Sequence, residues 1–240
     1  MKTIAIGVGE NKNILEACNI FKNQRPDTNI RLIYDDEELV KAVLDEETDG
    51  VVRGSLSAIN IMHDLKEEYP NLTRATYVNS PNYEFLLTPV GIDEGNTLED
   101  RFEMAIKCGE FLEKLNKTPK IAVLAKGRKG DYGRSEEIST SIEESEKLTE
   151  QIQNETEYDV NNYYILVEKA IKDKCNVIIA PDGIIGNIIF RTLVLLDSWP
   201  SYGAVTFGID RIYIDTSRDQ TVDGYTRSLI LAHDLVHGNK

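Results

Sequence analysis

The sequence predicts an α/β fold with mainly parallel sheets. Short apolar runs that suit strands alternate along most of the chain with longer segments whose apolar residues recur at helical spacing. Loops rich in glycine and proline follow several of the apolar runs. The 240 residues, 41% hydrophobic and 28% charged, suffice for one large domain or two small ones.

The elements follow one another as strand and helix from the first residues onward. The expected strands are Thr3–Val8, Ile30–Tyr34, Gly50–Gly54, Tyr77–Val78, Phe85–Leu87, Lys120–Ala125, Val177–Ala180 and Ile212–Ile214. The expected helices are Asn11–Lys22, Asp36–Glu46, one through Ile59, Met62 and Leu65, Leu98–Leu115 behind a Thr97 cap, Ile138–Gln153 and Tyr163–Lys172.

A break in this alternation predicts a domain boundary. The run Pro89–Ile92 interrupts the pattern, which places one seam within Thr88–Gly95 and the return near Ile212–Asp215. We therefore expect a first α/β domain of residues 1–88 plus 212–240 and a second of residues 89–211.

Charge and composition exclude several classes of function. A net charge of −14 argues against binding nucleic acid, because neutralising phosphates needs clustered Lys and Arg. No apolar run is long enough to span a bilayer and no signal peptide is evident, so we expect a cytoplasmic protein without a membrane partner. The cysteines Cys18, Cys108 and Cys175 are scattered, and buried thiols are the favoured interpretation.

The segment 176–191 is the most informative stretch of the sequence. A buried strand stops there, Gly183 and Gly186 let the backbone approach a ligand closely, and an apolar helix is expected to begin near Asn187. Ligands of open α/β sheets bind at such strand ends, and a helix start followed by Arg191 favours an anion. A Gly-rich turn that only connects two elements is the alternative.

Three more loops follow expected strands and carry residues suited to anions. They contain Arg53, Gly54 and Ser55; Gly127, Arg128, Gly130 and Arg134; and Thr216, Ser217 and Arg218. The second loop packs four cations and three glycines into residues 125–134 of an acidic protein, which should attract anions. For these three loops, in the same order, the alternatives are a capped helix start, a mobile surface turn and a capped turn with an exposed ion pair. If the sheets are parallel, all four loops line one cleft.

These loops suggest a binding site for an anionic small molecule, phosphorylated or carboxylated. Arg218, Arg53 and Arg128 or Arg134 would hold the anion, and Asn187 with the 183–186 backbone would shape the floor. Ser217, Arg218 and Asp182 are the candidate catalytic residues.

Other chemistries lack their motifs. His233 and His237, spaced i and i+4, could share a helix face, but no Glu stands between them as in H-E-x-x-H, so no metal site is predicted. There is no G-x-S-x-G elbow, and Gly7-Val8-Gly9 lacks the third glycine of a dinucleotide fingerprint.

At these loops the chain resembles a known superfamily, the phosphate acetyl/butyryl transferases. The ordered segments are TDGVVRGSLSA, TPVGIDEGNTLEDRFEMAIKCGEFLEKLNKTPKIAVL, APDGIIGNIIFR and DTSRDQTVDGYTRSLILA. Within the superfamily, VRGSLSA, PVGIDEG, GRKGDYGR, APDGIIGNIIFRTL and DTSR are most similar to the MtxX family, also called methanogenesis marker protein 4, whose archaeal members are named as methyltransferase subunits. The resemblance runs from about Thr48 to the end.

The resemblance implies an isocitrate-dehydrogenase-like, phosphotransacetylase-like architecture, with one α/β domain inserted into the other around an interdomain cleft, usually in a homodimer. In the phosphotransacetylases a Ser-Arg pair serves acyl transfer between phosphate and coenzyme A, and it corresponds to Ser217-Arg218. The acidic partner of that pair corresponds to Gly224, beside Asp223.

Three functions are consistent with this resemblance. The first is a transferase subunit of methanogen methyl metabolism that binds an anionic small molecule and works with partner subunits. The second is a phosphate acyltransferase that makes acyl-CoA, and the third is a non-catalytic binding or assembly subunit. No cofactor is evident in the sequence; coenzyme A or a methyl carrier is the expectation, and a methyl donor would belong to a pterin or corrinoid partner.

Overall fold

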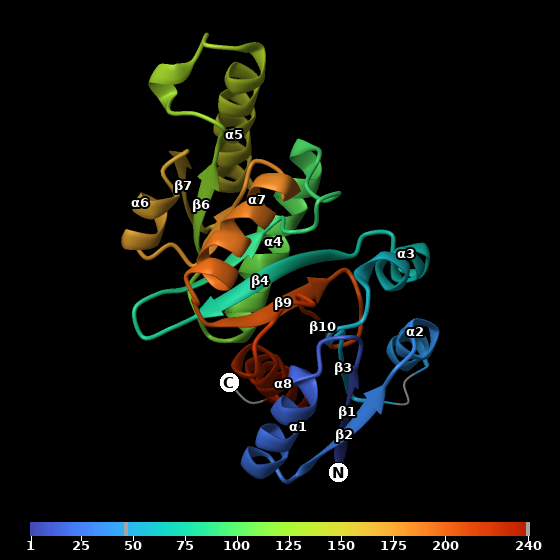
Figure 1. Cartoon of the computed structure of the whole chain (residues 1–240). Helices are drawn as coiled ribbons and strands as arrows, with labels where there is room; N and C mark the ends of the chain where they lie inside the picture. Colours follow the sequence, from blue (N-terminus) through green and yellow to red (C-terminus); the bar gives the residue numbers. More distant parts are fainter. Residues whose placement is uncertain (46–47, 239–240) are drawn as a thin grey trace. The chain divides into compact units, whose positions relative to one another are not determined.

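The computed structural model describes residues 1–45 and 48–238, and it has the α/β architecture that the sequence predicts (Figure 1). Glu46, the expected end of the second helix, lies outside the described residues. Among the described residues, no helix is both long enough and apolar enough to cross a membrane.

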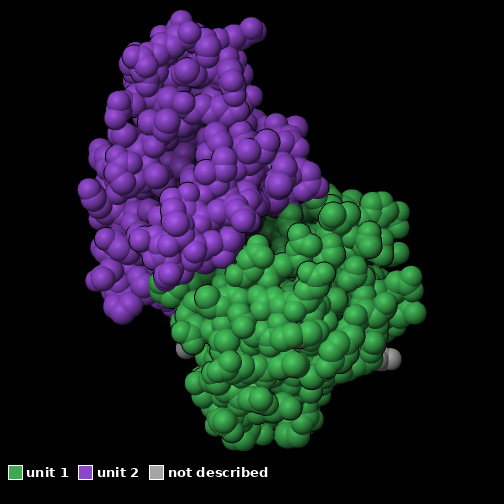
Figure 2. Space-filling model, viewed as in Figure 1, with its two compact units in different colours: residues 1–74, 200–240 green, residues 75–199 purple. Residues whose placement is uncertain are grey.

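The chain divides into two compact units (Figure 2). Unit 1 contains residues 1–74 and 200–240, and unit 2 contains residues 75–199. These junctions lie 12 to 14 residues before the seams expected at 88 and 212. Pairing explains the difference, because the strand Glu84–Thr88 runs beside a strand of unit 2, and Ser201–Phe207 beside a strand of unit 1.

Unit 1 is a mixed, mostly parallel sheet with helices packed on it. Its elements are β1 (Lys2–Gly7), α1 (Asn13–Gln24), β2 (Thr28–Ile33), α2 (Asp36–Leu44), β3 (Gly50–Val52), α3 (Ala58–Glu68), β9 (Ser201–Phe207), β10 (Tyr213–Asp215) and α8 (Val222–His237). The strand order is β2-β1-β3-β10-β9, and β9 alone is antiparallel to its neighbour in this set. Helices α1 and α8 pack against each other, as do α2 and α3.

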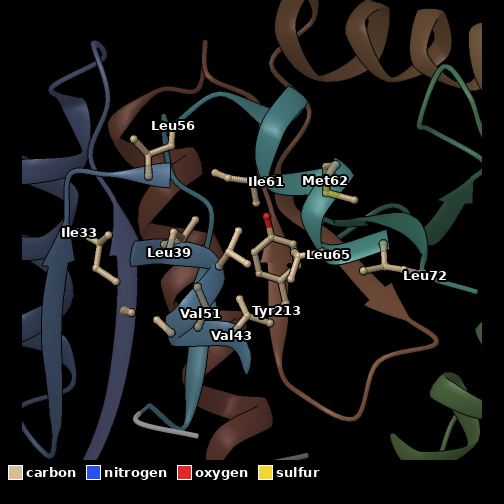
Figure 3. Packing of buried hydrophobic residues seen from close by; sticks show 13 residues of the cluster. Ile33, Leu39, Val43, Val51, Leu56, Ile61, Met62, Leu65, Leu72 and Tyr213 are labelled. Carbon is tan, nitrogen blue, oxygen red and sulfur yellow. The ribbon is translucent and has the colours of Figure 1, made fainter. Parts of the chain in front are cut away.

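One hydrophobic cluster of unit 1 lies where α2 and α3 cover the sheet (Figure 3). Leu39 and Val43 of α2 and Ile61 and Leu65 of α3 are spaced so that they fall on one helix face, and all four are buried. The ring of Tyr213 lies among them and is 1% exposed.

The strands of unit 2 are also mostly parallel to one another. Its elements are β4 (Thr73–Asn79, which begins in unit 1), β5 (Glu84–Thr88), α4 (Leu98–Lys114), β6 (Lys120–Leu124), the 3₁₀ turn η1 (Lys129–Asp131), α5 (Glu136–Glu155), β7 (Asp159–Tyr164), α6 (Val167–Lys172), β8 (Val177–Ile179), α7 (Gly183–Phe190) and the π-helical turn η2 (Arg191–Leu196). The strand order is β4-β5-β8-β6-β7, with β4 and β5 antiparallel and the other pairs parallel.

The structure corrects two sequence expectations in unit 2. The expected helix Tyr163–Lys172 is confirmed only in its second half, as α6 (Val167–Lys172). Tyr163 and Tyr164 instead end strand β7, because Val160 and Tyr163 pack inward while the strand pairs with β6. The helix expected to begin near Asn187 begins at Gly183, since the Asp182 carboxylate accepts a hydrogen bond from the Ile185 amide at 2.8 Å and caps it. The Thr97 cap of α4 is confirmed, with Asp100 completing a capping box.

Candidate functional site

The sheet of unit 1 has a topological switch point between β1 and β3. From β1 the chain passes through α1 to β2 on one side, whereas β3 and then β10 lie on the other side. The loops that follow β1 and β3 therefore lead in opposite directions at the carboxyl ends of the strands. In open α/β sheets this is where ligands bind.

The loops after β1 and β3 are joined by short contacts. The Ser55 hydroxyl accepts a hydrogen bond from the Gly9 amide at 2.8 Å and donates to the Asn11 carbonyl at 3.0 Å. Gly54 has φ 65°, and a Cβ there would lie 1.9 Å from the Gly7 carbonyl oxygen. Gly54 thus has a positive φ and a closely approaching backbone oxygen, and only glycine accommodates both without strain. Ser55 and Gly54 therefore hold the loops after β1 and β3 together.

Hydrogen bonds from Asn11 and Tyr225 hold the backbone of the loop after β10. The side chains of Ser217 and Arg218 remain available to other partners. The Asn11 amide nitrogen lies 2.9 Å from the carbonyl oxygens of both Arg218 and Gln220. The Tyr225 hydroxyl lies 2.9 Å and 3.1 Å from the carbonyl oxygens of Arg218 and Ser217. Burial raises the pKa of Tyr225 to about 12, so this hydroxyl stays protonated at neutral pH.

Ser217 and Arg218 are the groups at this loop that can meet a ligand. The Ser217 side chain is half-buried and accepts a weak hydrogen bond from the Asp219 amide at 3.3 Å, so its proton is available to another acceptor. The Arg218 guanidinium is exposed and makes no hydrogen bond or ion pair with any residue of 1–45 or 48–238. A guanidinium and a hydroxyl side by side suit a phosphate or carboxylate.

Arg53, which the sequence predicts as an anion ligand, is surrounded by protein acceptors. Its guanidinium hydrogen-bonds the Asp215 carboxylate, the Thr216 carbonyl and, at 2.5 Å, the Leu56 carbonyl, and the residue is 5% exposed. Arg74 lies 2.8 Å from the other oxygen of Asp215. Burial alone would raise the pKa of the Asp215 carboxyl, but Arg53 and Arg74 hold it below its ordinary value.

Thr216 completes this buried arrangement. Its hydroxyl donates to the Gly54 carbonyl at 2.7 Å, so it joins the β10 loop to the β3 loop and faces away from solvent. Arg74, at the start of β4, and Asp215 are members of the network that the predicted site did not include. An arginine in a strand gives no local signal of a buried carboxylate elsewhere in the chain.

In unit 2 the loops after β6 and β8 meet. Lys126 lies 3.0 Å from Asp182 and 2.9 Å from Glu137. Burial alone would raise the pKa of Asp182, but the hydrogen bond from the Ile185 amide and the charge of Lys126 lower it below its ordinary value. The loop therefore carries less free positive charge than its sequence indicates.

The remaining cations of this loop differ in their partners. Arg134 pairs with Asp131 at 3.2 Å, and Lys129 with Glu146 at 3.4 Å. Arg128 is exposed, and no described residue forms an ion pair with its guanidinium. Gly127 is buried against Ile138, while Gly130 faces open space.

Gly183, Gly186 and Asn187 serve packing inside unit 2. A Cβ at Gly183 would lie 1.7 Å from the Gly91 carbonyl oxygen, and one at Gly186 would lie 1.8 Å from that of Pro89. The Asn187 amide donates to the Val90 carbonyl at 2.9 Å. The close backbone approach that the glycines predict is thus made by the loop 89–95. Arg191 is exposed at the start of η2.

The structure brings the predicted residues together in two groups. Arg53, Gly54, Ser55, Thr216, Ser217 and Arg218 lie at the switch point of unit 1, and the residues predicted after β6 and β8 lie in unit 2. Convergence of both groups on one cleft stays a prediction, because it depends on how the units are placed relative to each other.

The fold is that of the phosphotransacylases and the isocitrate dehydrogenases. A branched-chain phosphotransacylase from Enterococcus faecalis V583 superposes with a TM-score of 0.73 at 18% identity over 99% of both chains. Isocitrate dehydrogenase from Methylococcus capsulatus superposes with a TM-score of 0.58 at 10% identity over 98% of this chain and 85% of that one. At these identities the likeness concerns the fold alone.

The chain belongs to the MtxX-like methyltransferase family of methanogens. It is 37% identical to an "uncharacterized methyltransferase" of Methanocaldococcus jannaschii over 94% of each chain. It is 36% identical to the "putative methyltransferase mtx subunit X" of Methanosarcina mazei over 87% of this chain and 75% of the relative. No protein-family model matches the sequence.

Proposed function

We propose that this chain is an anion-binding subunit of a methyltransferase system, and that it takes a phosphorylated or carboxylated small molecule at the switch point of unit 1. Arg218 forms the ion pair with the ligand, and Ser217 donates a hydrogen bond to it. Family membership supports the link to methyl transfer, and the term "subunit" in the names of relatives supports partner subunits.

One observation supports this function above the others. The Arg218 guanidinium is exposed at the carboxyl ends of parallel strands, while its own carbonyl is held by Asn11 and Tyr225. A side chain whose backbone is fixed loses less entropy on binding than one on a mobile loop. The site is thus preorganised for an anion before any ligand arrives.

The experiment is a thermal-shift titration of the purified chain. The ligands are phosphate, acetyl phosphate, coenzyme A, acetyl-CoA, S-adenosylmethionine and methylated pterin and corrinoid carriers. A ligand that binds the native state raises the melting temperature by mass action. Arg218→Ala removes a charge-assisted contact of about 1.5–3 kcal/mol, so the affinity should fall by about 10- to 150-fold.

Lys41→Ala is the control, because Lys41 is also an exposed cation of unit 1 but lies in α2 and is not among the predicted anion ligands. Its affinity for the same ligand should stay at the wild-type value. If no ligand raises the melting temperature, or if the shift survives Arg218→Ala, the proposal is wrong.

The fold supports a second function, an acyltransferase that joins acyl phosphate and coenzyme A to give acyl-CoA and phosphate. In this reaction Ser217 and Arg218 serve the transfer, and Ser217→Ala abolishes acyl-CoA formation while phosphate still binds. A non-catalytic binding or assembly subunit is supported instead if Ser217→Ala changes no activity and Arg218→Ala abolishes binding. The expected homodimer is tested by light scattering during gel filtration.

A further inference from the structure

Two histidines and one aspartate meet at the far end of α8. His233 and His237 stand one helical turn apart, with ring centroids 4.2 Å from each other. The Nε2 atom of His233 lies 3.6 Å from Asp27 Oδ1, and that of His237 lies 3.7 Å from Asp27 Oδ2. One ligand atom from each residue falls within a set no more than 4.8 Å across.

The other nitrogen of each ring is already used. His237 Nδ1 lies 2.9 Å from the His233 carbonyl oxygen, and His233 Nδ1 lies 2.9 Å from the Asp234 carboxylate. A carbonyl and a carboxylate can only accept, so each Nδ1 carries a proton, and the Nε2 of a neutral ring then presents a lone pair. This is the orientation that outer partners impose on metal-ligating histidines.

His233 Nε2 is the atom that the protein leaves unexplained. It is buried and has no hydrogen-bond partner among the described residues, and His233 is only 3% exposed. The ring is held by an edge contact with Phe21, whose centroid lies 6.1 Å away. Buried polar atoms nearly always have a partner, so a buried lone pair beside a carboxylate indicates a bound group.

We propose that Asp27, His233 and His237 bind one divalent transition-metal ion, with Zn²⁺ the best chemical match. Two imidazoles and a carboxylate are ligands that Zn²⁺ favours, and water would occupy the fourth position. Ligands at about 2.0–2.2 Å from a tetrahedral ion lie about 3.3 Å apart, so the nitrogen–oxygen separations must shorten by a few tenths of an ångström. The Asp27 side chain is 61% exposed and can make that movement.

The position of the site indicates a structural role. Asp27 precedes β2 at the amino ends of the strands, whereas Ser217 and Arg218 lie at the carboxyl ends. Along α8, His233 is about 18 Å from the Thr221 cap, at 1.5 Å per residue. The ion would therefore not touch the anion site, and it would join residues 1–74 to residues 200–240, the two segments of unit 1.

The test is Zn²⁺ binding to the full chain, purified without a histidine tag and treated with a chelator. Calorimetric titration should give one equivalent of Zn²⁺, and the melting temperature should rise. Co²⁺ should give a visible absorption band of a histidine-bound ion. Asp27→Asn and His237→Ala are the test variants, because both positions reach the surface and their folding can be verified by circular dichroism.

His63→Ala is the matched control, since His63 belongs to a second group, His63, Asp64 and Glu67, in which His63 and Glu67 are exposed. The two test variants should weaken Zn²⁺ binding by at least about 100-fold. This exceeds the loss of about 10- to 100-fold that is expected when a residue that only hydrogen-bonds a metal ligand is replaced. The control should keep the wild-type affinity. The proposal is overturned if the wild type binds no stoichiometric Zn²⁺, if the test variants bind as tightly as the wild type, or if His63→Ala abolishes binding.

Discussion

Replacing Asp215 with Asn should destabilise the protein strongly. The Asp215 carboxylate accepts hydrogen bonds from Arg53 and Arg74, and all three side chains are no more than 10% exposed. Removing one member of a buried ion-pair network leaves uncompensated charge and costs about 3–5 kcal/mol. At about 2–4 °C per kcal/mol for a chain of this size, the melting temperature should fall by about 6–20 °C.

The effect should depend on pH in a defined direction. The pKa of Asp215 is held below its ordinary value in the folded state, so its contribution to stability is complete above the unfolded pKa of about 3.9. That contribution disappears as the pH falls through the folded pKa. The difference in unfolding free energy between the wild type and Asp215→Asn should therefore be constant between about pH 7 and pH 5 and shrink below about pH 4.

Scanning calorimetry is the assay, because it resolves two transitions if the units melt separately. Glu38→Gln is the control, since the Arg31–Glu38 pair of unit 1 has a similar distance, 2.9 Å, but side chains 37% and 47% exposed. Loss of such a surface pair should cost about 0–1 kcal/mol. A free energy of unfolding for Asp215→Asn within about 1 kcal/mol of the wild type at pH 7 would refute the reasoning.

Three further outcomes are expected. In urea unfolding, Gly183→Ala should lower the free energy of unfolding by about 1–3 kcal/mol, because its Cβ would lie 1.7 Å from a carbonyl oxygen. Gly130→Ala, with open space at that position, should change it by less than about 0.5 kcal/mol. Burial raises the pKa of the Cys108 thiol far above its ordinary value, so a thiol reagent should label it at pH 8 only after unfolding, and rapid native labelling would contradict this. Tyr225→Phe removes the hydroxyl near the Ser217 carbonyl and should cost about 1 kcal/mol and weaken anion binding; unchanged values in both measurements would argue against the anchoring role.

Local patterns predicted most of the fold. Helix α4 has a cap that is readable from sequence and a clear apolar face, so both its existence and its start are confirmed. Strand β7 was missed because Asn161 and Asn162 interrupt the alternation of its apolar residues, and only pairing with β6 makes it a strand. The start of α7 was placed too late because Asp182 acts as a cap directly after Pro181.

The candidate site was less predictable, because its partners are distant in sequence. Arg53 appears in the sequence as an exposed cation after a strand, and nothing local reveals that Asp215, 162 residues away, binds it. The same holds for His233 and His237, whose i and i+4 spacing is visible while Asp27 is not part of any motif. The sequence shows which residues stand at strand ends, but it does not show which distant residue each side chain contacts.

The division of unit 1 between the two ends of the chain affects its biosynthesis. Residues 75–199 are continuous and can fold as they leave the ribosome, but β3 must wait for β10, its parallel neighbour. At about 5–20 residues per second, residues 53–212 between these two strands take about 8–32 s to synthesise. During that interval the nascent chain exposes an unpaired strand edge, a template for aggregation. We expect chaperone dependence of this protein to be concentrated in that period, and to be relieved when the last segment is released.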